Sequence, residues 1–283
     1  MGSYATTFNL FDNITHLCGK IKKGDSMKIF VLASGSKGNA MCVEVENETI
    51  LIDVGISYMK IKEKVETLKI DLDKIKVLFL THEHHDHIMG LMTFLKKSKI
   101  ETVYLSKGTL ESLPEKVKIE ILKKEIVVIK ADEVFHFDNT KITTVGLSHD
   151  ANEPLGFVFE KEDKKFVHLT DTGYVDHAYY ELLENANIYF LEANHEPEML
   201  LRSARPFALK KRILSELGHL SNDDASWLIN RVIKQKAIWV IAHISEDCNT
   251  QIAIEESIIK HVEDPTLLEV YYADQTNLLV FEI

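Results

Sequence analysis

Apolar residues recur along the chain in short runs and in helical spacing, and these patterns predict the secondary structure from Met27 onward. Short runs rich in Val, Ile, Leu and Phe, bounded by Gly, Asn or Asp, predict strands. Apolar residues spaced three and four apart predict amphipathic helices that lie on a sheet. The expected strands span 28–33, 40–45, 49–54, 77–80, 102–105, 126–129, 141–147, 156–160, 166–170, 188–192, 237–243 and 267–272. The expected helices span 56–68, 88–97, 177–184, 206–217, 222–234 and 250–261.

The order of these elements predicts an α/β fold. Strands come first and helices follow, twice over, as expected for a four-layer αββα sandwich built from two similar halves. The length of 283 residues suits one large domain of this kind. We expect that domain to span residues 27–283, because the first apolar strand begins next to Met27. Residues 1–26 then form an N-terminal extension, for which the sequence indicates no role.

Composition indicates a soluble, cytoplasmic protein without a membrane partner. No apolar run approaches the roughly 18 residues that a membrane span requires, and the N-terminal residues lack the basic and apolar regions of a secretory signal. The three cysteines, Cys18, Cys42 and Cys248, are far apart and form no Cys-x-x-Cys motif. They argue against a disulfide framework and against a thiolate zinc site. The sequence indicates no oligomeric state.

The charge balance restricts how the chain can bind nucleic acid. The 33 Lys and Arg residues stand against 44 Asp and Glu residues, which gives a formal net charge of −11. A broad basic surface therefore does not supply the affinity. A nucleic-acid substrate stays compatible with this charge, because bound divalent ions would add positive charge at the place where a phosphate sits.

A dense set of metal-ligand residue types directly follows the expected strand at 77–80. The segment 81–87 reads THEHHDH and contains His82, His84, Asp86 and His87. Imidazole nitrogen and carboxylate oxygen together suit Zn²⁺ or Mn²⁺, and Fe²⁺ is also compatible. In an extended segment His82 and His84 point to one side and can hold one ion, whereas Asp86 and His87, at the turn into the next helix, can point at a second. The spacing therefore predicts two divalent metal ions.

The pattern His-x-His-x-Asp-His after a hydrophobic strand resembles the signature of the metallo-β-lactamase superfamily. The resemblance implies further ligands at the ends of later strands: His149 for the first metal, Asp171 as a carboxylate that bridges both metals, and His243 for the second. Taken alone, each of these is equally an ordinary residue at a strand end. Asp53 lies in a segment similar to the family's Asp-x-Gly turn and would support the ligand loop. An ordinary turn aspartate would occupy the same place.

Two later segments, 191–196 and 218–222, resemble the Glu and Gly-His-Ser elements of ribonuclease Z and its phosphodiesterase relatives. By that resemblance Glu192 would hold His219, and His219 would stabilise the transition state or protonate the leaving oxygen. The alternative for His219 is a residue at the start of a helix. Asp86 and Asp171 would serve as catalytic residues as well as ligands, and Asp171 would orient the attacking hydroxide.

Several polar residues are candidates for contact with the substrate. The small and polar residues of the loop 33–39 can present backbone N–H groups to a phosphate, although a tight hairpin has the same composition. Others lie close to the Glu and His elements in the sequence. The candidate substrate-binding residues are Ser34, Ser36, Lys37, Asn39, His195, His219 and Ser245.

Over about residues 27–283 the chain resembles the YycJ/WalJ group of stand-alone proteins with the metallo-β-lactamase fold. The resemblance implies a 5′-to-3′ exonuclease that acts on DNA, with single-stranded DNA favoured and metal-bound hydroxide as the nucleophile. The chain has no inserted β-CASP domain between residues 171 and 243 and no Gly-rich basic arm, which argues against ribonuclease J and ribonuclease Z. Two alternatives stay open: a small-molecule hydrolase of this fold, such as a cyclic nucleotide phosphodiesterase, and a non-catalytic metal-binding module.

Overall fold

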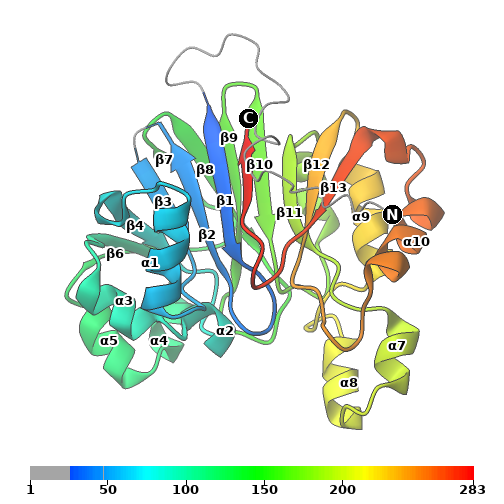
Figure 1. Ribbon diagram of the computed structural model, residues 1–283, viewed down its shortest axis with the longest axis horizontal. Helices are drawn as coiled ribbons and strands as arrows, with labels where there is room; N and C mark the ends of the chain where they lie inside the picture. Colours follow the sequence, from blue (N-terminus) through cyan, green and yellow to red (C-terminus); the bar gives the residue numbers. More distant parts are fainter. Residues whose placement is uncertain (1–25, 47) are drawn as a thin grey trace, which may run out of the picture.

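Two mixed β-sheets face each other at the centre of the computed structural model, which describes residues 26–46 and 48–283 (Figure 1). The first sheet has the strand order β14-β1-β2-β3-β4-β5-β6, and the second has the order β13-β12-β11-β10-β9-β8-β7. The strands of the first sheet are β1 (Met27–Ala33), β2 (Ala40–Val45), β3 (Glu48–Ile52), β4 (Ile75–Phe79), β5 (Thr102–Ser106), β6 (Glu125–Ile129) and β14 (Leu279–Glu282). Those of the second are β7 (Val134–Phe137), β8 (Thr140–Gly146), β9 (Leu155–Lys161), β10 (Lys164–Leu169), β11 (Ile188–Glu192), β12 (Ala237–Ala242) and β13 (Leu268–Tyr272).

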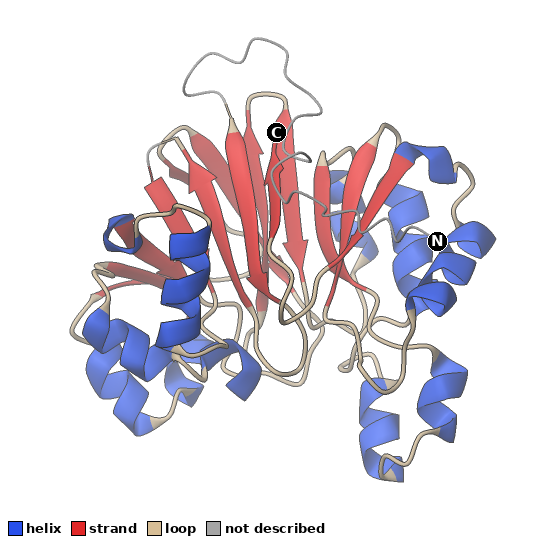
Figure 2. Ribbon diagram, in the orientation of Figure 1, coloured by secondary structure: helices blue, strands red, loops and turns tan. Residues whose placement is uncertain are grey.

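Helices cover the outer face of each sheet, as Figure 2 shows by colour. The helices in the first half are α1 (Tyr58–Thr67), α2 (His85–Ile88), α3 (Leu91–Lys97), α4 (Lys107–Ser112) and α5 (Glu115–Ile121). Those in the second half are α6 (Tyr180–Leu183), α7 (Pro197–Arg202), α8 (Phe207–Ile213), α9 (Asn222–Val232) and α10 (Gln251–His261). Short 3₁₀ turns occur at Leu72–Lys74, His177–Tyr179 and Pro265–Leu267. In the described part of the chain no helix is long and apolar enough to cross a membrane.

Three apolar clusters hold these layers together. One joins α1, α3 and α5 to the first sheet and includes Phe94, and another joins α9 and α10 to the second sheet and includes Trp239. The third fills the space between the sheets, where Phe79 and Phe157 pack with their ring centroids 5.2 Å apart. The layer order is helix, sheet, sheet, helix, so the predicted four-layer αββα sandwich is confirmed.

The expected elements differ from the observed ones mainly at their ends. The helix expected over 56–68 begins at Tyr58, because the Ser57 side chain accepts a hydrogen bond from the Lys60 N–H and caps it. The helix expected over 88–97 is α3, which begins only at Leu91, and the separate short helix α2 precedes it at His85–Ile88. The sequence patterns gave no sign of α4, α5, α7, β7 or β14, which are short. The expected N-terminal extension lies outside the described residues except for Ser26.

The ends of six strands bring the candidate site residues to one end of the sandwich. Asp53 follows β3, the segment 81–87 follows β4, and His149 lies just beyond β8. On the second sheet, residue 171 follows β10, residue 192 ends β11 and residue 243 follows β12. These strand ends and their loops meet at the lower end of the molecule in Figure 1. The topology therefore brings together candidate site residues that lie almost two hundred positions apart in the sequence.

Candidate active site

Three histidines form the first group of possible metal ligands. One side-chain nitrogen from each of His82, His84 and His149 lies within 4.8 Å of the others. Nε2 of His149 is 3.1 Å from Nδ1 of His84. The opposite nitrogen of His149, Nδ1, lies 2.9 Å from the carbonyl oxygen of Gly218 and donates to it, which leaves the Nε2 lone pair directed at the group. These are the three histidines that the sequence assigns to the first metal.

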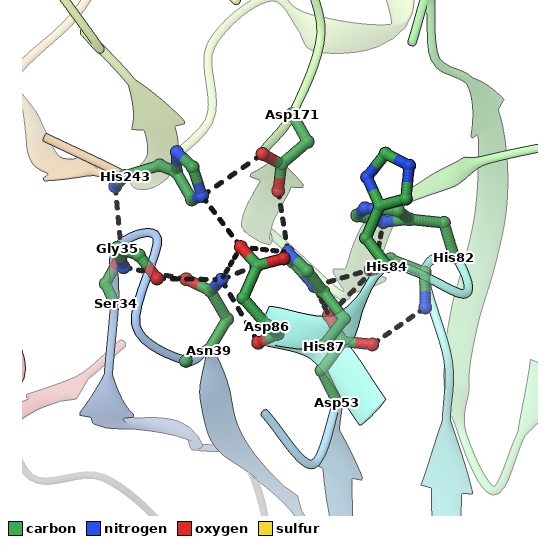
Figure 3. Close-up of polar contacts among 12 residues, drawn as sticks. Ser34, Gly35, Asn39, Asp53, His82, His84, Asp86, His87, Asp171 and His243 are labelled. Carbon is green, nitrogen blue, oxygen red and sulfur yellow. Dashed lines mark hydrogen bonds and ion pairs between the residues drawn. The ribbon is translucent and has the colours of Figure 1, made fainter. Parts of the chain in front are cut away.

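A second group lies beside the first and combines one carboxylate with two histidines (Figure 3). Nε2 of His243 is 3.2 Å from Oδ2 of Asp86, and Nε2 of His87 is 3.7 Å from the same oxygen. This is the second-metal set that the sequence predicts.

Asp171 lies between the two groups. Its Oδ2 is 2.8 Å from Nε2 of His87, and its Oδ1 is 3.2 Å from Nε2 of His243. The carboxylate also forms a set of possible ligands with His82 and His87. A single buried carboxylate thus touches both groups, which is the position that a bridging ligand requires.

The Asp53 carboxylate forms three hydrogen bonds with the metal-ligand loop, residues 81–87. Its Oδ1 accepts from the N–H of Thr81 at 2.9 Å, and its Oδ2 accepts from the Thr81 hydroxyl at 2.8 Å and from Nδ1 of His87 at 2.7 Å. The contact with Nδ1 fixes the His87 tautomer and leaves Nε2 as the ligand atom. Asp53 therefore contacts the loop that the sequence predicts it to support.

The backbone at the site is strained in a way that the sequence patterns do not reveal. Asp53, Asp171 and His243 have positive φ angles of 59°, 59° and 48°. Residues with a Cβ adopt this left-handed region at a cost, and such residues concentrate at functional sites. All three occur directly or one residue after a strand ends, where the chain must turn sharply to aim a side chain at the shared edge.

The electrostatics of the two groups differ. Burial holds the pKa of His82 well below its usual range, so its imidazole is neutral, as a metal ligand must be. Burial opposes charge at His87 too, but the carboxylates of Asp53 and Asp171 outweigh it and raise the His87 pKa. Burial also opposes charge at His243, but the neighbouring carboxylates, above all Asp171, outweigh it and raise the pKa of His243 to about 9. The carboxylates around the second group therefore favour positive charge there.

The donor set fits divalent metal ions. Nε2 of His82 is buried without a hydrogen-bond partner, which is costly for a polar atom unless something else binds it. Two imidazole nitrogens face each other at 3.1 Å, and buried carboxylates converge on the same space. Neutral imidazoles and carboxylates in this arrangement are typical of divalent transition-metal sites, and they indicate that the chain binds divalent metal ions.

Glu192 and His219 form a pair at the edge of the two groups. Glu192 is fully buried, accepts from the N–H of Thr172 at 2.6 Å through Oε1, and lies 3.0 Å from Nδ1 of His219 through Oε2. The His219 ring stacks on the His243 ring with centroids 5.0 Å apart. The sequence expects this pair, and the structure brings it together. Asp171, Glu192, His219 and His243 also have the spacing of a metal-binding set, so His219 has two possible roles.

The loop between β1 and β2 forms hydrogen bonds with the metal-ligand residues through Ser34 and Asn39. Ser34 Oγ accepts from the His243 N–H at 2.9 Å, and Asn39 Nδ2 lies 3.3 Å from Oδ2 of Asp86 and 3.0 Å from Nε2 of His87. Four of the six N–H groups of residues 34–39 already have acceptors. Ser36 and Lys37 are exposed, and Lys37 forms an ion pair with Glu246. These contacts favour a positioning role for Ser34 and Asn39.

His195, Ser245 and Arg205 lie near His219, since Arg205 contacts Ser245 and the charges of His219 and Arg205 act on His195. His195 is buried, neither ring nitrogen has a hydrogen-bond partner, and burial lowers its pKa to about 4. Arg205 donates to Ser245 Oγ at 3.2 Å and approaches Asp247 at 3.4 Å. In the sequence Arg205 is one member of a basic cluster before His219 that also contains Arg202, Lys210, Lys211 and Arg212. Its contact with Ser245 adds a cation to the candidate substrate residues.

The lack of a side chain at Gly55 allows its backbone to pack directly against the backbone of Asp86. A Cβ at position 55 would lie 1.7 Å from the Asp86 carbonyl oxygen and 2.4 Å from the Asn39 nitrogen. We expect Gly55→Ala to lower the free energy of unfolding by about 2–3 kcal/mol in urea titration and to lower the metal content, because the Asp86 loop must move. Gly146→Ala is the matched control, since the nearest atoms there are 3.2 Å and 3.3 Å away. An equal effect of both substitutions would contradict this explanation.

Comparison with known proteins places this geometry in a family. The model of the β-lactamase superfamily domain matches residues 48–244. The exodeoxyribonuclease WalJ of Streptococcus pneumoniae is 35% identical over 227 residues, which cover 78% of this chain and 83% of that protein. The exodeoxyribonuclease YycJ of Bacillus anthracis is 31% identical over 235 residues, which cover 83% of this chain and 88% of that protein.

A solved structure shows the same fold. The metallo-β-lactamase fold protein YhfI of Bacillus subtilis aligns with a TM-score of 0.67 over 92% of this chain and 100% of its own, at 15% sequence identity. The family model covers the segment 81–87 and all the strand ends that carry the two ligand groups. The chain therefore belongs to the β-lactamase superfamily and, within it, to the family of the WalJ and YycJ proteins.

Proposed function

We propose that the chain is a two-metal phosphodiesterase that removes nucleotides from the 5′ end of single-stranded DNA. The observation that carries the proposal is the buried Glu192 carboxylate, which lies 3.0 Å from Nδ1 of His219 at the edge of the ligand groups. The names of the relatives, exodeoxyribonucleases WalJ and YycJ, support the substrate class. The mixed histidine and aspartate donors suit Zn²⁺ or Mn²⁺ as the two ions, and Fe²⁺ is compatible as well.

The side chains divide the chemistry between them. When bound, two divalent ions would acidify a water molecule and offset negative charge on the phosphate. Asp86 and Asp171 would be among the ligands that hold them, and the Asp171 carboxylate would orient the attacking water. Glu192 holds His219 through Nδ1, which leaves Nε2 of His219 to protonate the leaving oxygen or to stabilise negative charge on the phosphate. With 16% of its side chain exposed, His219 is accessible to a substrate.

Contacts beyond the reacting phosphate come from the residues next to that pair. Arg205, held at Ser245, supplies a guanidinium suited to a phosphate oxygen. His195, whose ring nitrogens are buried and unpartnered, supplies a neutral donor or acceptor. Arg205 also lies 3.4 Å from Asp247, whereas Arg212 binds Asp150 more closely and through two nitrogens. The net charge of −11 therefore does not oppose binding, since a few placed cations act at the site itself.

The experiment that tests this function compares labelled DNA with small phosphodiesters. Chelator-treated protein receives Mn²⁺ or Zn²⁺ and is incubated with single-stranded DNA labelled at the 5′ or the 3′ end. We expect metal-dependent release of nucleotides from the 5′ end and no activity without added metal. Cleavage of bis-p-nitrophenyl phosphate or a cyclic dinucleotide without cleavage of DNA would instead indicate a small-molecule phosphodiesterase. No turnover of any substrate would indicate a binding module or another hydrolase chemistry.

We further propose a cytoplasmic location. Cys42 and Cys248 are buried and free, and neither has a cysteine partner among the described residues. Free buried thiols are typical of proteins in a reducing compartment. Burial raises the pKa of the Cys42 thiol to about 12, so this thiol is inert rather than reactive.

A further inference from the structure

An open pocket lined by aromatic side chains adjoins the candidate active site. It has a volume of about 110 Å³, well above the roughly 10–15 Å³ that one water requires. Tyr174, His177, Tyr180 and Trp227 contribute rings to its wall. Tyr174 and Trp227 are 41% and 39% exposed, so large apolar surfaces face the solvent there. None of these residues belongs to the ligand groups or to the Glu192–His219 pair.

The rings form one connected cluster from two separate parts of the chain. His177 lies 4.8 Å from Tyr180 and 6.3 Å from Trp227, measured between ring centroids, and Tyr174 lies 6.4 Å from His177. Trp227 comes from α9, whereas the other rings come from residues 174–180, which lead into and begin α6. The guanidinium of Arg231, one turn further along α9, lies 4.9 Å from the Trp227 ring centroid. A planar aromatic ligand is the kind of molecule that fits such a cluster.

Short stretches of chain connect the pocket to the reacting centre. Gly173 lines the pocket and lies two residues after Asp171. Between them, Thr172 donates its N–H to Glu192. Leu220 lines the pocket from the other side and directly follows His219. The pocket wall therefore contains the direct chain neighbours of Thr172 and His219.

The charge of the pocket selects a base rather than a phosphate. Asp224 lines it, and Ser221 holds the Asp224 carboxylate by donating its hydroxyl to Oδ2 at 2.6 Å. A carboxylate repels a phosphate but accepts hydrogen bonds from the exocyclic amino groups of bases. Adenine, cytosine and guanine carry such a group, and thymine does not.

We propose that this aromatic pocket binds the nucleobase next to the bond that is cleaved, and that Asp224 makes it prefer bases with an exocyclic amino group. The proposal rests on the proposed function, because a DNA strand whose phosphate lies at the ligand groups presents a base on either side of that phosphate. Stacking supplies the affinity, and the contact with Asp224 supplies the preference.

The first test is a double-mutant cycle between pocket and base. Trp227→Ala and Tyr174→Ala are compared with wild type on single-stranded DNA whose nucleotides flanking the first 5′ bond carry bases or are abasic. We expect each variant to raise KM about tenfold on intact DNA and to leave KM unchanged on abasic DNA. Trp227→Phe should restore most of the binding. Ile259→Ala is the control, because it removes an exposed apolar side chain from α10 that does not line the pocket. Equal losses on both substrates would overturn the proposal.

The second test measures binding without turnover. The chain has two tryptophans, and Trp239 is fully buried, so quenching of tryptophan fluorescence by a mononucleotide reports on Trp227. We expect dCMP to bind roughly tenfold more tightly than dTMP, because one well-formed hydrogen-bonded contact discriminates by about that factor. Asp224→Asn should remove this preference. If dCMP quenches but DNA is not cleaved, only the proposed function fails. If no nucleotide quenches while DNA is cleaved, the pocket is not a base site.

Discussion

Asp171→Asn is expected to abolish metal-dependent hydrolysis, lowering kcat/KM by roughly 10³-fold or more, since it weakens both metal sites at once. The carboxylate lies 2.8 Å from His87 and 3.2 Å from His243 in the second group, and it forms a possible ligand set with His82 of the first group. Asparagine keeps the size of the side chain and tolerates the positive φ angle. The measurement is the steady-state rate on 5′-labelled DNA, together with metal content by mass spectrometry.

A matched control separates this effect from general damage. Asp138→Asn makes the same substitution at an exposed residue with a φ angle of 50°, and we expect it to keep both rate and metal content. Thermal unfolding adds an independent measurement: a chelator should lower the melting temperature of wild type and of Asp138→Asn, but it should barely affect Asp171→Asn. A variant Asp171→Asn that retained its metal and its activity would refute the assignment of a bridging carboxylate.

The ligand groups were predictable because their residues lie at the ends of apolar strands. Three of the four motif ligands in the segment 81–87 are histidines, and each later candidate follows a strand of the second sheet. Strand ends that share an edge bring their side chains together whatever the length of the loops between them. The resemblance to the metallo-β-lactamase superfamily supplied the order in which His149, Asp171 and His243 appear. Local sequence patterns alone would leave each of them an ordinary strand end.

Contacts that depend on exact distances were not predictable. The composition of the loop 33–39 suits a phosphate site and a tight hairpin equally, and it does not reveal that Asn39 approaches Asp86 and His87 or that Ser34 binds the backbone of His243. Composition gives the polarity of a loop but not the direction of each N–H group. The same holds for Arg212, which sequence places in a basic cluster and the structure pairs with Asp150.

The aromatic pocket illustrates a second limit. Its rings come from residues 174–180 and from residue 227, and each set has a sufficient local explanation as a turn or as one face of a helix. Only the packing of α9 beside α6 turns them into one surface. The short helices α4, α5 and α7 were missed as well, and with six or seven residues each shows at most two turns of apolar spacing.

His219→Ala is expected to lower kcat on DNA by roughly 10²–10³-fold while metal content stays unchanged, because general-acid assistance is lost and the ligands are not. The identity of the leaving group makes the test specific. The alkoxide that leaves DNA needs a proton, whereas p-nitrophenolate is stable without one, so the loss on bis-p-nitrophenyl phosphate should be less than about tenfold. Glu192→Gln should act in the same direction but more weakly, since it loosens the hold on Nδ1 of His219.

Metal content decides between the two roles that the geometry allows His219. The histidine forms a possible metal-binding set with Asp171, Glu192 and His243, and it also lies against Glu192 as an acid would. If His219→Ala loses metal and slows both substrates equally, His219 is a ligand and the proton must come from elsewhere. If it keeps its metal and slows only DNA cleavage, His219 is the acid. His136→Ala, at an exposed position of β7, controls for the loss of an imidazole. Because the two outcomes move different observables, this one variant assigns the Glu192–His219 pair to proton transfer or to metal binding.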